Sequence, residues 1–334
     1  MNTTFTSSAP GRLCLFGEHQ DYLGLPVVAM AIDRRCKLTF SPREDQKVSV
    51  KSEALGHVAE FDLQSSDEMD ARQPLGMALR ELTHEFGHQS LHGWNVDIKS
   101  DIPIQAGCSS STALLTAWVA SWLRILGGHC EVKEVVSRCH QYEVLKFNGA
   151  GGDMDQFACG HGGLHRFGVG SPQPLHLPSG TFVLADSGQP KDTQVHLKRC
   201  RDARLPLMPH LDASSGFDKE SQALIDGTRI NRDLESHWSA LMSRTQVDGA
   251  SMGLALTEHH AVLRDVLGLS TPRIESMLQA ASNAGAWGGK INGSGGGGCA
   301  FVLCPDSAVT DVIEAMQMAG ARGAWAVHLD KGVS

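Results

Sequence analysis

The order of apolar and polar positions along the chain predicts a mixture of strands and helices. Short apolar or alternating runs are typical of strands. They are found at 13–16, 27–32, 37–40, 47–50, 94–98, 182–185, 299–303 and 324–329. Longer runs with helical spacing are found at 75–86, 111–126, 132–147, 230–242, 250–267, 272–284 and 309–318. This mixed order predicts an α+β fold with a boundary near residue 178, after a proline-containing stretch.

The composition is that of a globular chain with an excess of glycine. The 334 residues are 41% hydrophobic, which is enough for a sizeable core and excludes a disordered chain. Sixteen of the 36 glycines fall within 149–170 and 285–298, without the G-X-Y period of collagen. Glycine is favoured where the backbone must approach a ligand closely or adopt a positive φ. The two windows are therefore candidate parts of a site.

The charge pattern excludes two classes of partner. The net charge is −8, with acidic and basic residues interspersed, so we expect neither nucleic acid nor an anionic membrane surface. The apolar run at 112–126 is too short to span a bilayer and contains Arg124.

The nine cysteines include no CxxC pair, and residues 1–8 lack the features of a secretory signal. We expect a cytoplasmic protein, and no protein partner is implied.

Two short motifs match well-known signatures in an unsuitable context. His84 and His88 have the H-E-x-x-H spacing of a zinc hydrolase, but Gly87 should end the helix beneath the second histidine. The run 293–298 satisfies G-x-G-x-x-G, but we expect a helix before it and a strand after it, the reverse of a dinucleotide-binding fold. A zinc hydrolase at the two histidines is kept only as a minor alternative.

A loop near the N-terminus gathers side chains that can bind hydroxyl groups. Residues 17–22 read Gly-Glu-His-Gln-Asp-Tyr, and Arg12 precedes them in an expected strand. Carboxylates accept hydrogen bonds in pairs, so Glu18 and Asp21 suit a polyhydroxylated ligand. A solvated turn with charge pairs is the alternative interpretation of this segment.

The segment before the helix at 111–126 has the features of a phosphate site. Residues 107–112 read Gly-Cys-Ser-Ser-Ser-Thr. The positive end of a helix favours phosphate, and serine hydroxyls can donate to phosphate or bind Mg²⁺. One serine would suffice as an N-cap, so three in succession favour anion binding. The glycine run 293–298 would let the backbone approach the same ligand or another loop.

Together these segments resemble the GHMP kinase family, which comprises galactokinase, homoserine kinase, mevalonate kinase and phosphomevalonate kinase. The resemblance extends from Ala9 to Cys299. Residues 17–22 are similar to the galactokinase signature G-E-H-x-D-Y, and residues 152–157 to its G-I-M-D-Q-F. The resemblance implies an α+β two-domain fold. It has a ribosomal protein S5-like N-terminal domain at 1–178, a ferredoxin-like C-terminal domain at 179–334, and the active site in the cleft between them.

The same resemblance implies a role for each matching residue. Asp155 matches the catalytic base toward the anomeric hydroxyl, and Arg12 matches the residue that orients and stabilises that site. The matching substrate-binding residues are Glu18, His19, Asp21, Gly152 and Asp153. The matching ATP-binding residues are Gly107, Cys108, Ser109, Ser110, Ser111, Thr112, Gly293 and Gly295. Ser111 and Glu143 match the groups that hold Mg²⁺.

Three departures from galactokinase concern the choice of substrate. Asp153 stands where isoleucine is usual. If its carboxylate faced the sugar, like-charge repulsion would disfavour uronic acids, so we expect no activity on galacturonate. Thr193 stands where a tyrosine usually contacts the sugar. Gln73 and Pro74 stand where the adenine side usually has a tryptophan, which leaves the nucleotide preference open.

The sequence thus predicts an ATP- and Mg²⁺-dependent kinase that phosphorylates the C1 hydroxyl of a hexose, with D-galactose as the leading substrate. The alternatives are a 1-kinase for N-acetylgalactosamine, L-arabinose, fucose or a uronate, a sensor that binds sugar and ATP without turnover, and the zinc hydrolase. Retention of Arg12, Glu143 and Asp155 argues against the sensor, because a sensor needs no catalytic base.

Overall fold

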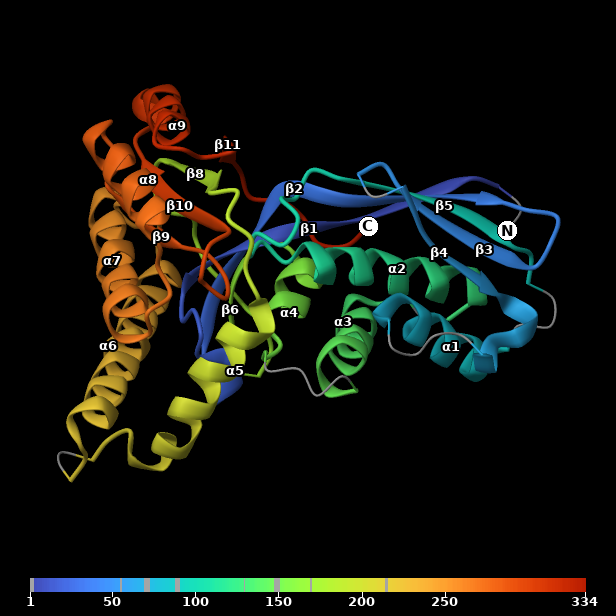
Figure 1. The fold of residues 1–334 in the computed structure, drawn as a ribbon, viewed down its shortest axis with the longest axis horizontal. Coiled ribbons are helices and arrows are strands. Elements are labelled where there is room, and N and C mark those ends of the chain that lie inside the picture. Colours follow the sequence, from blue (N-terminus) through green and yellow to red (C-terminus); the bar gives the residue numbers. More distant parts are fainter. Residues whose placement is uncertain are drawn as a thin grey trace.

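Two sheets of unequal size organise the chain, and helices pack against each of them (Figure 1). The computed structural model describes residues 3–54, 56–68, 73–87, 91–128, 130–146, 151–168, 170–213 and 216–334. One hydrophobic core contains residues of both sheets, and the ring of Phe16 stacks on Trp238 at a centroid distance of 6.0 Å. The division into domains at 1–178 and 179–334 stays a prediction.

Two long antiparallel strands, β1 (Phe5–Phe16) and β2 (Val27–Pro42), run through the larger sheet. The hydrophobic pattern predicts shorter, separate strands here, because polar residues interrupt it in the middle of β2. The structure shows that β2 continues through them. Arg35 forms an ion pair with Asp330 near the C-terminus, at 2.7 Å. The polar interruption therefore marks a contact with a distant segment, and the prediction that a strand ends there was wrong.

The other strands extend the larger sheet in the order β4-β3-β5-β2-β6-β7, with β1 beside β2. The pair β3 and β5 is parallel, and the remaining pairs are antiparallel. The strand bounds are β3 Lys47–Ser52, β4 Gly56–Asp62, β5 Trp94–Ser100, β6 Leu164–Phe167 and β7 Gln173–Pro174.

Helices cover one face of this sheet (Figure 1). Their bounds are α1 Pro74–Phe86, α2 Ser110–Leu126, α3 Val132–His140 and α4 Met154–His161, with a π-helical turn at Gln141–Leu145. Trp118 and Trp122 lie one turn apart on α2, and their rings lie 6.0 and 6.1 Å from that of Phe40 in β2. Burying each of these aromatic rings stabilises the fold by roughly 2–3 kcal/mol. The packing also fixes where the N-terminus of α2 lies.

The smaller sheet has the order β11-β8-β10-β9 and is antiparallel. Its strands are β8 Thr181–Asp186, β9 Gly288–Ile291, β10 Cys299–Cys304 and β11 Gly323–Val327. The helices of this part are α5 Thr193–Arg204, α6 Lys219–Met242, α7 Gly249–Ala261, α8 Pro272–Asn283 and α9 Val309–Met318, with a π-helical turn at Val262–Val266. Among the described residues, no helix is long and apolar enough to cross a membrane.

Short 3₁₀ turns complete the chain at Asp21–Leu23, Leu63–Glu68, Leu205–His210 and Asp306–Ala308.

Most helices begin within a residue of their predicted start. Helix α6 differs, because it begins at Lys219, ahead of the predicted 230. Its N-cap, Asp218, accepts a hydrogen bond from the Ser221 amide at 2.9 Å, so a capping residue marked this start where apolar spacing did not.

The structure also corrects the context of the glycine run 293–298. Strand β9, which reads Gly-Gly-Lys-Ile and lacks an apolar pattern, precedes the run where a helix was expected. Strand β10 follows it, so the run connects two antiparallel strands. A dinucleotide-binding loop needs a helix after it, so the predicted strand after the run still excludes the motif, and only the predicted helix before the run was wrong.

The connection between β9 and β10 lies against the segment that precedes α2. The Cys299 amide donates to the Ala106 carbonyl at 2.7 Å. Gly293 has a φ of 79°, and a Cβ atom there would lie 2.6 Å from the carbonyl oxygen of Gly107. Glycine is therefore needed at 293 both for its conformation and for the close approach of two loops.

We predict that Gly293→Ala destabilises the protein more than Gly127→Ala does. Gly127, after α2, has a φ of 75°, and no atom lies within 4 Å of the position that an added methyl group would take. Its substitution should cost only the left-handed conformation, about 1–2 kcal/mol. Gly293→Ala adds a steric clash of roughly 1–3 kcal/mol. Chemical denaturation measures both, and equal losses would contradict the close approach.

Candidate active site

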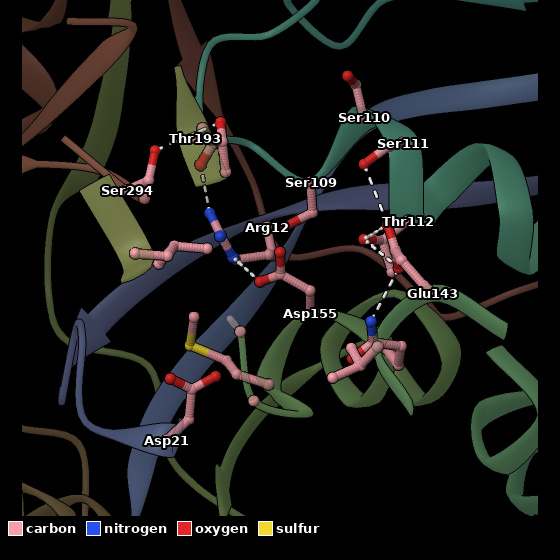
Figure 2. A pocket seen from close by; sticks show the side chains of 18 of the residues that line it. Arg12, Asp21, Ser109, Ser110, Ser111, Thr112, Glu143, Asp155, Thr193 and Ser294 are labelled. Carbon is pink, nitrogen blue, oxygen red and sulfur yellow. Dashed lines mark hydrogen bonds and ion pairs between the residues drawn. The ribbon is translucent and has the colours of Figure 1, made fainter. Parts of the chain in front are cut away.

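A pocket opens where the first loop, the N-terminus of α2, the start of α4 and the glycine run meet. It contains about 930 Å³ of space, part of it open to solvent. Figure 2 shows Asp21 toward one end, Glu143 with Ser111 and Thr112 at the other, and Arg12 with Asp155 between them. The predicted site residues that line it are Arg12, Glu18, His19, Asp21, Gly107, Ser109, Ser110, Ser111, Thr112, Glu143, Gly152, Asp155 and Gly293.

Three predicted site residues do not line this pocket. Cys108 is buried behind the loop, where its Sγ lies 3.5 Å from the side-chain nitrogen of Asn292. Gly295 packs against Leu269, since a Cβ there would lie 2.5 Å from that side chain. Asp153 directly precedes α4 and lies outside the lining, although its charge still contributes to raising the pKa of Asp21. These residues lie around the site without forming its wall.

Arg12 and Asp155 form an ion pair at the centre of the pocket. Arg12 lies on β1 and is only 4% exposed, and Asp155 lies in the first turn of α4. The Arg12 Nε donates to Asp155 Oδ1 at 2.8 Å, and its Nη1 donates to the Gly107 carbonyl. Burial opposes the charge of Arg12, but the neighbouring carboxylates Asp155 and Glu18 raise its pKa overall. The arginine thus connects the carboxylate to the loop before α2.

The residues at the N-terminus of α2 present hydroxyl groups to the pocket. Ser109 is the N-cap, but its φ is 60° and its side chain makes no capping hydrogen bond. Ser109 therefore does not cap the helix through its side chain. The buried Ser109 hydroxyl has no hydrogen-bond partner among the residues that the structure describes. Both this hydroxyl and the positive end of α2 are therefore available to an anion.

Glu143 lies in the π-helical turn and faces the start of α2. Its carboxylate accepts hydrogen bonds from Ser111 at 3.1 Å, from Thr112 at 2.8 Å and from the Gln156 amide at 2.8 Å. Burial raises the pKa of Glu143, although these three donors oppose the shift. A carboxylate beside a hydroxyl offers the hard oxygen ligands that Mg²⁺ prefers, usually together with phosphate oxygens and water. The residues therefore fit Mg²⁺.

At the other end, Asp21 lies near three other carboxylates, those of Asp155, Asp153 and Glu18. Burial, then Asp155 and Asp153, raise the pKa of Asp21 to about 7. Glu18 is 2% exposed and forms a 2.7 Å ion pair with Lys290 of β9, which is fully buried. Burial alone would raise the pKa of Glu18, but Lys290 and Arg12 outweigh it and lower that pKa to about 2. Glu18 is therefore a paired anion, whereas Asp21 has no cation partner among the described residues.

His19 is held by residues that the sequence analysis did not identify. Its Nδ1 lies 2.8 Å from the Tyr22 hydroxyl, which accepts a hydrogen bond from Arg204 at 2.6 Å. Because the Tyr22 oxygen already accepts from Arg204, the Tyr22 hydroxyl can donate its own proton to Nδ1 of His19. The neutral imidazole then carries its hydrogen on Nε2. Burial, then Arg204, lower the pKa of His19 to about 3. Arg204 and Lys290 lie far from this loop in sequence, so no spacing rule could have found them.

The remaining predictions fall partly outside this site. Thr193 lines the pocket, where its hydroxyl lies 3.4 Å from that of Ser294. Gln73 and Pro74 stand at the start of α1 and do not line it. His84 lies in the last turn of α1, and His88 lies outside the described residues. Within the described part of the chain, no three His, Cys, Asp or Glu residues are grouped to hold a metal ion on their own.

The raised pKa of Asp21 gives a testable pH dependence. The pKa of Asp21 is about 7 in the folded protein, whereas its ordinary value is 3.8. Between these two pH values the folded state keeps a proton that the unfolded state has lost. This contribution to stability is complete below pH 3.8 and is lost as the pH rises to about 7. We predict that Asp21→Asn becomes more stable relative to the wild type over that interval. The gain is on the order of 2 kcal/mol, since partial exposure screens part of the effect.

Denaturation from about pH 4 to pH 8 measures this difference. Asp311→Asn, at an exposed position in α9, is the control and should follow the wild-type profile. A constant difference between Asp21→Asn and the wild type across the whole range would contradict the raised pKa.

Comparison with known proteins identifies the family. Residues 74–163 match the GHMP kinases N terminal domain, residues 244–322 match the GHMP kinases C terminal family, and residues 2–42 match the galactokinase galactose-binding signature. These matches include the strand that carries Arg12, the start of α2 and helix α4, which carries Asp155. They agree with the family predicted from the motifs.

Individual relatives carry two different names. A mevalonate kinase of Thermococcus gammatolerans is 29% identical over 94% of this chain and 93% of its own, and a galactokinase of Enterococcus faecalis is 30% identical over 92% and 87%. The solved galactokinase of Lactococcus lactis with galactose has a TM-score of 0.81 and 21% identity, covering 99% of this chain and 95% of its own. The chain therefore belongs to the GHMP kinases, a family that uses ATP to phosphorylate small molecules.

Proposed function

We propose that the protein is a sugar 1-kinase that transfers the terminal phosphoryl group of ATP to the anomeric hydroxyl of a neutral hexose, with D-galactose as the leading substrate. The observation that carries this proposal is the acidic character of the Asp21 end of the pocket, where the charges of Glu18 and of the central Asp155 act on Asp21. The cations beside them are already paired, Arg12 with Asp155 and Lys290 with Glu18. A neutral polyol supplies the hydroxyl donors that such carboxylates accept.

The same observation distinguishes a sugar from mevalonate. Mevalonate carries a carboxylate, which would lie near Asp21. Among the described residues that line the pocket, Arg12 supplies the arginine or lysine charge and is already paired with Asp155, whereas Arg204, which donates to Tyr22, does not line it. Like charges at close range in a partly buried site repel strongly. The galactose-binding signature at 2–42 and the Enterococcus relative also favour a sugar. Mevalonate stays the second candidate, because relatives that are 29% and 28% identical to this chain carry the name mevalonate kinase.

In the proposed mechanism, Asp155 orients the anomeric hydroxyl and accepts its proton as the oxygen attacks phosphorus. An anomeric hydroxyl is more acidic than an ordinary alcohol, so a modest base suffices. Arg12 holds the Asp155 carboxylate in place and positions it relative to Gly107. Catalysis of phosphoryl transfer is mainly positioning and charge stabilisation, which this fixed arrangement supplies.

At the phosphate end, the hydroxyl groups and amides at the start of α2 would hold the nucleotide phosphates. Ser111 and Glu143 would hold Mg²⁺, which when bound neutralises charge on the phosphates. Thr112 and Gln156 donate to the Glu143 carboxylate and so orient it. The sugar would bind at the side of the pocket that is lined by Glu18, His19 and Gly152. Gly293 would shape the wall between this side and the phosphate end.

Three further features bear on the substrate and the compartment. Thr193 faces the pocket where galactokinases usually have a tyrosine, so the sugar side has room for a different epimer or a substituent such as an N-acetyl group. Asp153 adds negative charge near Asp21, which supports the expectation that galacturonate is not turned over. All nine cysteines are free thiols, which supports a cytoplasmic, reducing location.

Coupled ADP release tests the substrate. The acceptors are galactose, N-acetylgalactosamine, L-arabinose, fucose, glucuronate, galacturonate and mevalonate, each with and without Mg²⁺. We predict turnover of a neutral sugar, no turnover of galacturonate or mevalonate, and phosphate on C1 of the product by ³¹P–¹³C coupling. Turnover of mevalonate alone would overturn the proposal in favour of the second candidate.

A substitution at Asp155 tests the mechanism. We predict that Asp155→Asn lowers kcat by about 10²–10⁴-fold, because the amide cannot accept the proton, while ATP binding by calorimetry is retained. Asp97→Asn, at an exposed position on β5, is the matched control and should keep wild-type turnover. A fully active Asp155→Asn enzyme would exclude the residue as the base.

A further inference from the structure

A fully buried lysine contacts the acceptor end of the pocket from behind its wall. Lys290 lies in β9, has no exposed surface and does not line the pocket itself. Its ammonium nitrogen donates to the Glu18 carboxylate at 2.7 Å and to the Cys14 carbonyl at 2.8 Å. A lysine is almost never fully buried unless it is paired, so the group that it pairs with indicates its role.

The neighbouring strands hold Lys290 in one position. Lys290 is paired with Phe301 of β10, and its ammonium lies 5.1 Å from the centre of that ring. Asn292 follows two positions later, and its side-chain oxygen accepts from the Cys14 amide at 3.0 Å. Lys290 therefore contacts the carbonyl of Cys14 while Asn292 contacts its amide. These two contacts join β9 to the end of β1, from which the loop at 17–22 begins.

Glu18 receives its hydrogen bonds from the same side of the molecule. Besides Lys290, the backbone amide of Gly293 stabilises the Glu18 anion. Glu18 is only 2% exposed, yet it lines the pocket. An ionised carboxylate offers about four acceptor positions on its two oxygens. Positions therefore remain on Glu18 for a hydroxyl group of a molecule in the pocket.

The charge of Glu18 depends on the groups that surround it. Burial lowers the pKa values of His19 and His259 to about 3, so both imidazoles are uncharged at neutral pH. Arg12 is already paired with Asp155. Lys290 is thus the cation that contacts the Glu18 carboxylate directly in the described part of the chain. The titratable or charged groups that act on Glu18 are Arg12 and Cys14 on β1, His19 and Asp21 on its own loop, Lys191 after β8, His259 on α7 and Lys290 on β9.

We propose that Lys290 is a positioning residue that keeps Glu18 ionised and holds its carboxylate toward the pocket, so that Glu18 accepts a hydrogen bond from a hydroxyl group of the acceptor. The inference rests on the proposed sugar kinase function. Lys290 does not line the pocket, so its effect reaches the acceptor through Glu18. A protonated or displaced Glu18 would lose an acceptor position that the sugar hydroxyl needs.

A double-mutant cycle tests whether Lys290 acts through Glu18. Lys290→Met should raise the KM for D-galactose, or for the neutral sugar that the acceptor panel identifies, at least tenfold at pH 7. Glu18→Gln should also raise it. In the Glu18→Gln background, Lys290→Met should change this KM less than twofold, because the carboxylate that it positions is gone. In all three variants kcat and the KM for ATP should change less than threefold.

The pH profile provides a second measurement that a merely structural role would not change. The pKa of Glu18 is lowered to about 2, so the wild type keeps Glu18 ionised from pH 5 to pH 8. Without Lys290, burial raises that pKa, and the sugar KM of Lys290→Met should fall as the pH rises and Glu18 loses its proton. Asp21 titrates in both proteins, so the ratio of the two KM values at each pH removes its contribution.

Lys99→Met is the matched control. Lys99 on β5 forms an ion pair with Glu53 at 3.4 Å, and both side chains are largely exposed, so this variant should keep the wild-type KM at every pH. Thermal unfolding of each variant shows whether it folds. The variant with both Glu18→Gln and Lys290→Met leaves no unpaired buried charge, so it should be more stable than Lys290→Met alone. Should Lys290→Met not fold, Lys290→Gln takes its place, because its amide still donates to the carboxylate and carries no charge.

Two kinds of result would overturn the inference, and they are distinguishable. If Lys290→Met raised the sugar KM equally with and without Glu18, or if the ratio of KM values did not change with pH, Lys290 would be a structural residue. If the wild-type protein turned over no sugar of the panel, the proposed function would fail, and the inference with it. The first result requires a wild type that is active on a sugar, so the two failures cannot be confused.

Discussion

The side-chain amide of Asn292 connects the three segments that build the pocket. Its oxygen accepts from the backbone N–H of Cys14 in β1 at 3.0 Å, and its nitrogen donates to the carbonyl of Gly107 at 2.8 Å. Asn292 directly follows β9 and is fully buried, so water cannot replace hydrogen bonds that it loses. Because β1 belongs to the larger sheet and β9 to the smaller, this amide joins the two sheets at the pocket, together with the ion pair of Lys290 and Glu18 and the shared core. The distance between the acceptor and phosphate ends of the pocket depends on how these contacts hold the two sheets.

Around this amide, the charged groups fall into two kinds. The pairs Glu18 with Lys290 and Arg12 with Asp155 offset part of the cost of removing their charges from water. Lys191 lacks such a partner among the described residues, and it lies beside the phosphate loop. On the acceptor side, burial and then the charges of neighbouring carboxylates raise the pKa of Asp21. The fold therefore leaves a cation unsatisfied at one end and an acid at the other, so a ligand with phosphate at one end and hydroxyl groups at the other would complete both.

The sequence was sufficient for the elements and motifs whose signals are local. The helix α2, the loop at 17–22 and Asp155 follow from apolar spacing and short motifs, and the structure brings these segments to one pocket. The partners of those motifs were not predictable. Lys290 and Arg204 contact the first loop although they lie far from it in the sequence, and no local pattern indicates a contact over such a separation. The missed strand β9 has the same cause, because its glycines are explained only by the strands and loops that pack on it.

The fold alone does not determine the acceptor, because relatives with the names mevalonate kinase and galactokinase align along nearly the whole chain. Because these relatives share one fold, the discrimination between a sugar and mevalonate must come from the few groups that differ in charge or hydrogen bonding at the acceptor end of the pocket. A hydroxyl contact contributes about 1 kcal/mol, whereas an unpaired like charge in a partly buried site costs several. Burial, and then repulsion by Asp155 and Asp153, already raise the pKa of Asp21 before any substrate binds. An acceptor carboxylate would add to it, and a sugar hydroxyl would relieve it by donating to the carboxylate. The choice between the two substrates is therefore an electrostatic property of residues 17–22 and their neighbours.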